Sequence, residues 1–272
     1  MEQTMTDDLA IFIDSFDGNS DVWPSFFELF DCYWKNCSFK RYLICNMENY
    51  DTENLSIINT GNEYGWFPMT IKGLESIDER YIMFLLEDYA FSKMINNQDI
   101  YEIIHRMQEE EVFYYRLTSA DSFPPNKCFL CVPETTPYPI SLQPAIWDRR
   151  QFILILKDLY SKGAKTPWDF EKYFIEKYHN GRNDVMLQGV RYDTRNLLGY
   201  QNLIIQRKWD PRVVKYYKKQ GIIIHTGSRE YMSKKEVFWD GLKRNRIIRS
   251  LSPKNKNRIK MVLKKFGVKF MT

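Results

Sequence analysis

The sequence lacks any apolar run of the roughly 18 residues that a membrane-spanning helix needs. Its longest apolar stretches, near 152–156 and 222–224, are short enough to be core segments. The first eight residues are polar and acidic, so they do not resemble the positive region that opens a signal peptide. We therefore expect a cytoplasmic protein without a membrane span.

Cysteine and histidine are scarce, with five and three residues respectively. The cysteines are odd in number and irregular in spacing, which argues against a secreted disulfide framework. Cys128 and Cys131 form one CxxC motif, but no second pair and no nearby histidine completes the ligand set of a usual structural zinc site. We expect free thiols in a reducing compartment.

Material for a hydrophobic core is plentiful. The 272 residues are 44% hydrophobic and 16% aromatic, enough for one substantial α/β domain with a small appendage. A charged content of 27% suits a folded surface and excludes a disordered chain. The net charge of +4 is unevenly spread, because no acidic residue follows Asp240. We therefore divide the chain into a main domain, 1–240, and a basic tail, 241–272.

Strand and helix signals alternate through the first half of the chain, as is typical of an α/β fold. The clearest strand is 81–86, which is apolar without alternation, as expected of a central strand covered on both faces. The other elements expected here are strands at 9–14, 42–45 and 55–58, and helices at 23–36, at 67–77 and from residue 99.

In the second half, Thr166, Pro167 and Asp169 match the cap, first turn and third position of a helix with a capping box. The remaining expected elements are strands at 112–117, 129–132, 202–206 and 222–224, an extended segment at 141–146, and helices at 148–160 and from residues 210, 233 and 253. These elements predict an α/β fold with a mixed sheet.

Polar clusters follow three of the expected strands: 15–17, Asn46, and the pair Glu87 and Asp88. Ligands of open α/β sheets bind beyond the carboxyl ends of the strands. Two carboxylates at such an end suit Mg²⁺ or Mn²⁺, which can bridge a diphosphate leaving group. The alternative is that Glu87 or Asp88 caps the next segment or pairs with a surface lysine.

The order of seven stretches resembles the GT-A-type glycosyltransferases of bacterial capsule and O-antigen clusters. The stretches are IFIDSFDGNSDVW (11–23), RYLICN (41–46), TGNEYGW (60–66), FLLEDYAF (84–91), SLQPAIWD (141–148), TPWDFE (166–171) and QRKW (206–209). The resemblance spans roughly residues 9 to 230 and implies a GT-A-like, Rossmann-type mixed sheet with helices on both faces.

The resemblance also implies roles for particular residues. It assigns the nucleotide to Ser15, Asp17 and Asn46, and the metal-binding acidic motif to Glu87 and Asp88. Asp88 is then the ligand of Mn²⁺ or Mg²⁺, and Glu87 contacts the nucleotide sugar. The sequence reads Leu-Glu-Asp at this point, whereas the family has Asp-x-Asp.

Gly61 and Trp66 lie before the helix expected at 67–77, where the resemblance places the donor. Considered alone, Gly61 favours a turn with positive φ and Trp66 favours the core. Lys208 follows a strand and could set a cation against the diphosphate, or could be a solvated surface residue.

On the acceptor side, a single displacement at the anomeric carbon needs a base for the acceptor hydroxyl. The candidates are Asp148, Asp169 and Glu171, and Asp169 also fits a plain capping role. Trp147 and Trp168 could form a platform for the acceptor sugar or could pack in the core.

The tail is strongly basic and carries apolar residues at helical spacing. Its cations are Lys243, Arg244, Arg246, Arg249, Lys254, Lys256, Arg258, Lys260, Lys264, Lys265 and Lys269. This pattern favours peripheral attachment to an anionic membrane surface, here the inner face of the cytoplasmic membrane. Nucleic-acid binding and an ordinary basic surface helix are the alternatives.

We therefore predict an inverting, metal-assisted, hexosyltransferase-like enzyme that moves a sugar from a nucleotide sugar to a surface polysaccharide or a lipid-linked glycan. A sugar-phosphate nucleotidyltransferase is the first alternative, but such an enzyme needs a basic glycine-rich loop after the first strand, and 16–19 has no cation. A non-catalytic basic module that binds membrane or nucleic acid is the second.

Overall fold

The computed structural model describes residues 8–62, 65–118, 124–132, 136, 138–178 and 185–244. Its main sheet consists of β1 (Leu9–Asp14), β2 (Lys40–Cys45), β3 (Leu55–Asn59), β4 (Tyr81–Leu86), β6 (Tyr114–Arg116), β7 (Leu130–Cys131), β8 (Ala145–Asp148) and β9 (Val190–Tyr192). Two small antiparallel pairs join β5 (Tyr89–Ala90) to β10 (Gln201–Asn202) and β11 (Ile204–Ile205) to β12 (Lys208–Trp209).

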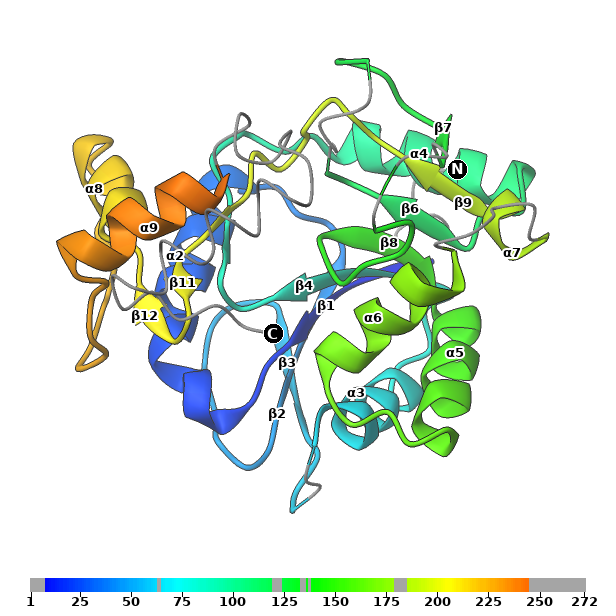
Figure 1. Cartoon of the computed structure of the whole chain (residues 1–272), viewed down its shortest axis with the longest axis horizontal. Coiled ribbons are helices and arrows are strands. Elements are labelled where there is room, and N and C mark those ends of the chain that lie inside the picture. Colours follow the sequence, from blue (N-terminus) through cyan, green and yellow to red (C-terminus); the bar gives the residue numbers. More distant parts are fainter. Residues whose placement is uncertain are drawn as a thin grey trace, which may run out of the picture.

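The helical elements alternate with these strands along the chain (Figure 1). They are η1 (Asp17–Val22), α2 (Trp23–Tyr33), α3 (Trp66–Glu75), α4 (Asn97–Glu109), α5 (Arg149–Ser161), α6 (Pro167–Lys177), α7 (Val185–Gln188), α8 (Pro211–Lys219) and α9 (Lys234–Arg244). Within the described ranges, none of these helices has the length and apolar character that crossing a membrane requires.

The strand order in the main sheet is β3-β2-β1-β4-β8-β6-β9-β7. The first four strands in this order are parallel, and β8 is inserted antiparallel between β4 and β6. After β1 the chain moves outward to β2 and β3, and then returns to the other side of β1 as β4. The carboxyl ends of β1 and β4 therefore form a topological switch point, where open α/β sheets bind their ligands.

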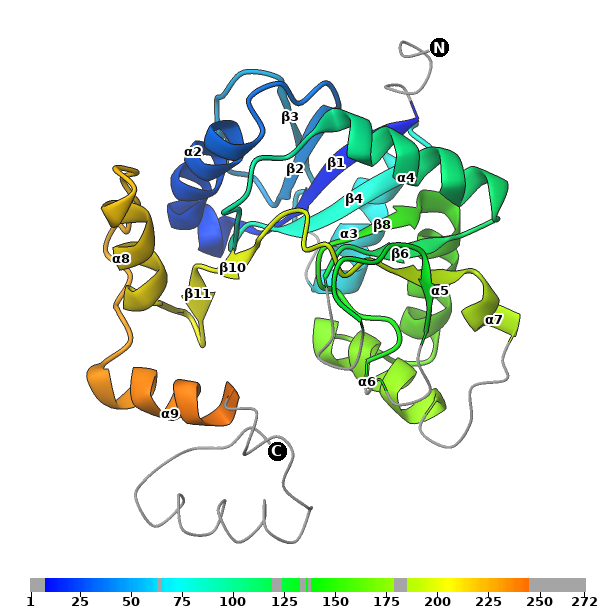
Figure 2. The same ribbon diagram turned by 90° about the horizontal axis from the view of Figure 1, so that it is seen from above.

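Helices cover both faces of the sheet, as predicted, and Figure 2 shows the two layers. Alternate residues of β1 point to opposite faces. Ile11 and Ile13 pack in one core with α2 and α4, whereas Ala10 and Phe12 pack in the other with α3, α5 and α6. The complete burial of β1 explains why its sequence is apolar without alternation.

The last described part of the chain returns to α2. The Tyr217 hydroxyl donates to the Phe91 carbonyl (2.7 Å), and the Ser25 hydroxyl bonds both the amide and the carbonyl of His225. Leu203, Trp209, Val213 and Tyr217 share one buried core with the apolar face of α2. This return covers α2 on the side away from the sheet.

Several expected elements are confirmed and others are shifted. The strand at 81–86 and the Thr166–Asp169 capping box are present as predicted. The segment expected as a strand at 202–206 is split between β10 and β11. The strand expected at 222–224 is wrong, because no neighbouring strand pairs with this segment in the described part of the chain. Most of the basic tail lies outside the described residues.

Candidate functional site

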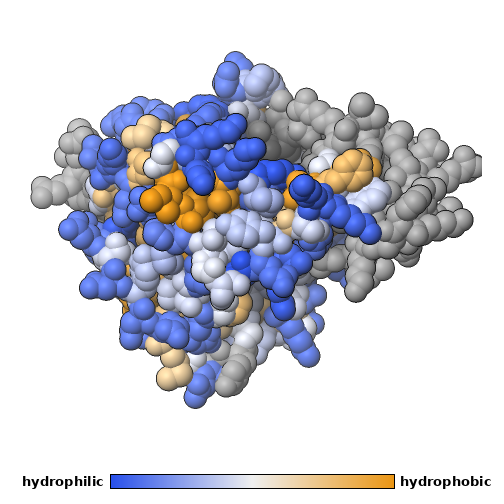
Figure 3. All heavy atoms as spheres, turned by 90° about the vertical axis from the view of Figure 1, so that its left-hand side faces the viewer, coloured by the Kyte–Doolittle hydropathy of each residue, from blue (hydrophilic) through white to orange (hydrophobic). Residues whose placement is uncertain are grey.

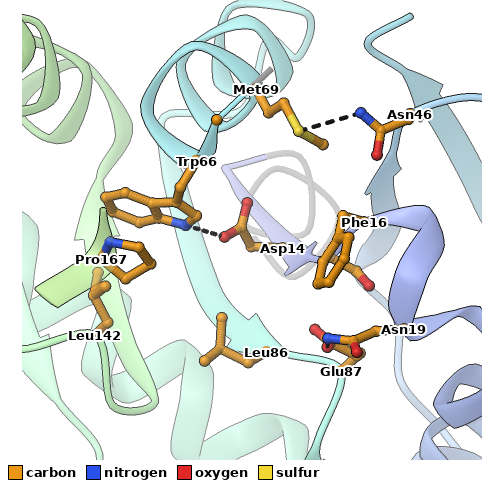
Figure 4. Close-up of a pocket in the computed structure, with 12 residues that line it drawn as sticks. Asp14, Phe16, Asn19, Asn46, Trp66, Met69, Leu86, Glu87, Leu142 and Pro167 are labelled. Atoms are coloured by element: carbon orange, nitrogen blue, oxygen red, sulfur yellow. Dashed lines mark hydrogen bonds between the residues drawn. The ribbon is translucent and has the colours of Figure 1, made fainter. Parts of the chain in front are cut away.

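A cavity of about 480 Å³ opens at the switch point. The carboxyl end of β1 contributes Asp14 and Ser15, the end of β2 contributes Asn46, and β4 leads directly into Glu87. Figure 4 shows Trp66 and Phe16 on opposite sides of Asp14. Each of the three predicted polar strand ends therefore contributes to one cavity, although Asp17 and Asp88 are absent from its lining.

Asp14 is the buried carboxylate at the centre of this cavity. It accepts hydrogen bonds from Trp66 Nε1 (2.5 Å) and Thr70 Oγ1 (2.9 Å). Burial raises the pKa of Asp14 to about 7, although the two hydrogen bonds oppose the shift. Asp14 was not predicted as a site residue, although its position as the last residue of β1 was the available signal.

The loops after β1 and β2 are fastened together by Asp17. Its carboxylate accepts hydrogen bonds from the backbone amides of Asn46, Met47 and Glu48. Asp17 therefore holds Asn46 in place at the cavity. Asn46 lines the cavity, whereas Asp17 itself does not. Ser15 does line the cavity, and it accepts a hydrogen bond from Trp23 Nε1 (2.8 Å).

Gly61 has φ +72°, so it forms a left-handed turn that side chains disfavour. Its amide donates to the Asn46 carbonyl (2.9 Å), and Gly61 does not line the cavity. Gly65, with φ +103°, lines the cavity instead and leads into α3. The structure therefore favours a turn role for Gly61, and it places Trp66 in the lining of the cavity.

Glu87 and Asp88 lie side by side at the end of β4. Glu87 is buried and accepts a hydrogen bond from the Asn19 side chain. Asp88 Oδ1 is buried and has no hydrogen-bond partner among the described residues. Burial raises the pKa of both carboxyl groups, and the neighbouring Asp88 charge raises that of Glu87 further. A bound cation would relieve this cost of burying two charges.

Arg229, a residue that was not predicted for the site, brings a positive charge to the cavity residue Asn19 and acts electrostatically on Asp88. Its guanidinium donates to Asn19 Oδ1 (2.9 Å) and to both carboxylate oxygens of Asp21. Its positive charge lowers the pKa of Asp88, against the larger effect of burial. Arg229 lies in an irregular loop far along the chain, so no local sequence pattern marks it.

Lys208, the cation predicted for the diphosphate, is engaged elsewhere. Its ammonium forms ion pairs with Glu230 (3.3 Å) and Glu236 (3.1 Å), and it does not line the cavity. The structure therefore gives no support to a donor contact by Lys208, whereas Arg229 reaches the cavity lining through its hydrogen bond to Asn19.

The carboxylates fit a divalent cation that arrives with its nucleotide. Within the described ranges, no cluster of three or more acidic, histidine or cysteine side chains forms a cage for a metal. Mg²⁺ and Mn²⁺ at nucleotide sites usually take one or two carboxylates and complete their shell with phosphate oxygens and water. The unpartnered Asp88 Oδ1 beside Glu87 suits that arrangement.

Of the three candidate bases, only Glu171 lies beside the cavity. Its carboxylate accepts from the amide of Leu142 (3.1 Å), a residue that lines the cavity, and burial raises the pKa of Glu171. Asp169 is half-buried and serves the capping box, where backbone amides of Lys165 and Thr166 lower its pKa. The structure therefore favours a capping role for Asp169.

Asp148 is at the wrong edge of the sheet. Because β8 is antiparallel to β4, Asp148 pairs with Tyr81 at the start of β4, whereas Glu87 follows its end. Six residues of strand separate the two carboxylates by roughly 20 Å. Asp148 caps α5 and forms an ion pair with Arg80 (3.6 Å). A catalytic role for Asp148 is therefore wrong.

The two tryptophans proposed as an acceptor platform differ in exposure. Trp147 is fully buried and stacks on Phe152 with ring centroids 4.2 Å apart, so it cannot contact a sugar. Trp168 is 64% exposed at the start of α6, next to the cavity residue Pro167. Trp168 therefore remains a candidate for contact with the acceptor sugar, and the prediction for Trp147 is wrong.

No protein-family model matches the chain, and no curated protein matches its sequence. Among solved structures, the fold is similar to *S. aureus* TarS 1–349, at 12% identity over 69% of this chain with a TM-score of 0.41. This chain covers 58% of that TarS fragment, which is also known in complex with UDP-GlcNAc.

Two further structures are similar in fold. The galactosyltransferase LgtC, in complex with donor and acceptor sugar analogs, matches at 8% identity over 86% of this chain and 99% of its own, with a TM-score of 0.46. The 4-diphosphocytidyl-2C-methyl-D-erythritol synthase of *Anaerococcus prevotii* matches at 12% identity over 75% of this chain and 94% of its own, with a TM-score of 0.43.

Proposed function

We propose that this chain is a glycosyltransferase that uses a nucleotide-sugar donor. The observation that carries the proposal is the pair Glu87 and Asp88, which directly follows β4 and of which Glu87 lines the cavity at the switch point. Asp88 Oδ1 has no partner among the described residues, and Arg229 lies close enough to shift the pKa of Asp88. Two acids with a neighbouring arginine suit a diphosphate bound together with a divalent cation.

The cavity of about 480 Å³ at the switch point, called the donor cavity from here on, has different side chains for the different parts of a nucleotide sugar. Trp66 and Phe16 present aromatic rings, and Asp14 and Asn46 present polar groups. Glu87 and Asp88 hold the diphosphate side, where Mg²⁺ or Mn²⁺ would neutralise the charge of the leaving nucleoside diphosphate. Arg229 provides a second positive charge there, so the charge that develops on the leaving group is stabilised from two directions.

Glu171 is the proposed base of an inverting single displacement by a hexosyltransferase. The acceptor oxygen attacks the anomeric carbon, the bond to the diphosphate breaks, and Glu171 takes the hydroxyl proton. Burial raises the pKa of Glu171, which improves a carboxylate as a proton acceptor. Trp168, exposed one turn before Glu171, offers a face for the acceptor sugar.

A sugar-phosphate nucleotidyltransferase is the second candidate, because of one contact. The loop 16–19 has no cation of its own, but the Arg229 guanidinium donates to the Gly18 carbonyl (3.2 Å) and to Asn19. Arg229 thus supplies the positive charge that such an enzyme needs at this loop. The glycosyltransferase remains the better fit, since the base candidate Glu171 lies beside the same cavity.

The decisive experiment is a thermal-shift screen of nucleoside diphosphates and nucleotide sugars, with and without Mn²⁺, followed by product analysis. We expect stabilisation by a diphosphate that is larger with Mn²⁺, and slow release of nucleoside diphosphate from one nucleotide sugar. Pyrophosphate release from a nucleoside triphosphate and a sugar 1-phosphate would support the nucleotidyltransferase. No stabilisation by any nucleotide would refute both enzymes and favour a binding module.

The proposed acceptor is a bacterial surface polysaccharide, such as capsule or O-antigen, or its lipid-linked precursor at the inner membrane face. Apart from the sequence resemblance, apolar exposure in the segment that precedes the basic tail in the sequence supports membrane attachment: Ile223 is 70% and Phe238 59% exposed. Figure 3 shows apolar patches among hydrophilic residues on the side of the molecule where Figure 1 draws α8 and α9. Full-length protein should bind anionic liposomes less as salt increases, and truncation after Arg244 should weaken binding.

A further inference from the structure

A second cavity, of about 410 Å³, lies between β10 and the start of α8. Tyr200, Gln201 and Asn202 form its β10 side, and Asp210 and Arg212 form its α8 side. Figure 2 shows β10 between the main sheet and α8. The donor cavity and this second cavity share no lining residue.

The two cavities are nevertheless linked through Tyr89, which directly follows Glu87 and Asp88. The Tyr89 ring packs on Tyr200 of the second cavity with centroids 5.0 Å apart. Its hydroxyl donates to the carbonyl of Leu142, which lines the donor cavity (3.1 Å). Tyr89 therefore separates the two cavities, and a molecule in the second one would lie next to the proposed diphosphate site.

The charges in the second cavity do not favour an anion. The Arg212 guanidinium bonds Asp210 at 2.9, 3.1 and 2.7 Å, and it also bonds Asp240 (2.5 Å). One guanidinium therefore faces two carboxylates, and no surplus positive charge remains among these three groups. Arg212, the positively charged residue in the lining of this cavity, is therefore already engaged by carboxylates and offers no free charge to a phosphate.

The uncharged groups of this cavity suit hydroxyl groups. Asn202 Oδ1 is buried without a hydrogen-bond partner in the described part of the chain, and Gln201 lies beside it. Amide side chains both donate and accept hydrogen bonds, as vicinal hydroxyl groups require. Tyr200 adds an aromatic ring, which combines an apolar face with a polar end.

We propose that this second cavity binds a neutral sugar unit of the acceptor glycan. The inference deepens the proposed function and rests on it, because a glycan bound here would lie next to the proposed diphosphate site, on the other side of Tyr89. The acceptor is recognised through uncharged sugar hydroxyls at this site, and phosphate groups of a lipid-linked precursor lie elsewhere.

A microarray of neutral and acidic bacterial surface glycans, probed with the full-length protein, tests this proposal. We expect binding to neutral glycans. Asn202→Leu and Gln201→Leu should each weaken the affinity for the best neutral glycan about tenfold, since a polar partner is lost. Gln98→Leu, an exposed change on α4, is the matched control and should leave the affinity unchanged.

Melting temperature and nucleoside diphosphate affinity of each variant show whether it is folded, and Gln201→Leu serves if Asn202→Leu unfolds. Binding of acidic glycans alone, no glycan binding, or unchanged affinity in the folded variants would overturn the proposal. If nucleotides bind but no glycan does, the second-cavity inference fails and the donor assignment stands. If glycans bind but no nucleotide does, the proposed transferase function fails.

Discussion

The Arg229 guanidinium and the Asp21 carboxylate, 208 positions apart in the sequence, are joined by hydrogen bonds of 2.8 and 2.6 Å. Arg229 also donates to Asn19, whose amide in turn donates to Glu87. A continuous set of polar contacts thus runs from a late loop to the end of the central strand. Asp21 holds the Arg229 guanidinium on the side of Glu87 and Asp88. The Arg229 side chain therefore loses little conformational entropy when a ligand binds.

We expect Arg229→Gln to weaken nucleoside diphosphate binding about tenfold or more, because a charge-assisted contact to phosphate is lost. Isothermal titration with and without Mn²⁺ measures this change. Lys208→Gln is the matched control, since Lys208 is paired with Glu230 and Glu236 away from the cavity. Equal affinity losses in both variants would contradict the assignment of Arg229.

Asp88→Asn should reduce transfer about a thousandfold or more while the protein stays folded. The carboxylate that holds the metal–diphosphate unit contributes several kcal/mol of transition-state stabilisation. The amide avoids the burial of a charge, so the melting temperature at pH 8 should not fall. Turnover and melting curves measured together test both statements, and turnover like that of the wild type would remove Asp88 from the mechanism.

Glu171→Gln and Asp169→Asn form a matched pair on the first turns of α6. Glu171→Gln should abolish turnover but keep nucleotide-sugar affinity, because only the proton acceptor is lost. Asp169→Asn should keep turnover and lower the melting temperature, because it weakens the capping box. Kinetics at saturating donor separate the two effects, and the reverse pattern of activities would identify Asp169 as the base.

Asp14 should make stability depend on pH. Its pKa is about 7 in the folded chain against 3.8 in the unfolded chain, so the folded state binds more protons between these values. The free energy of unfolding therefore falls as pH rises from about 4 to about 7, by at most about 4 kcal/mol from this group.

In Asp14→Asn that contribution is absent, so the wild type should lose stability relative to the variant across this window. Urea unfolding of both proteins at pH 4.5, 5.5, 6.5 and 7.5 measures the difference. A constant difference at all four values would show that Asp14 ionises normally.

The sequence predicted the elements whose signals are local. The strand at 81–86 is apolar throughout because both of its faces are covered. The start of α6 is indicated by the capping box of Thr166 and Asp169, which lie only three positions apart. The gathering of Asn46 and Glu87 at one cavity was also predictable, because carboxyl ends of parallel strands share an edge.

Features that depend on contacts between residues far apart in the sequence were not predicted. Asp148 was misplaced because strand direction in β8 is fixed by its neighbours β4 and β6 and leaves no mark in the sequence. Ile222 and Ile224 pack on the core and Ile223 is exposed, a strand-like alternation without a partner strand. Arg229 is brought to the site by contacts with residues about two hundred positions earlier.

The coverage of α2 by the late segment 203–225 also bears on biosynthesis. During translation, Phe26, Phe30 and their neighbours leave the ribosome long before Leu203 and Tyr217, which complete their core. Until then the nascent chain carries an aromatic helix face open to other chains, the kind of surface that aggregates or recruits chaperones. A chain that is terminated and released before residue 203 would therefore be prone to aggregate. Slow synthesis would lengthen the time for which the aromatic face of α2 is exposed in every full-length copy.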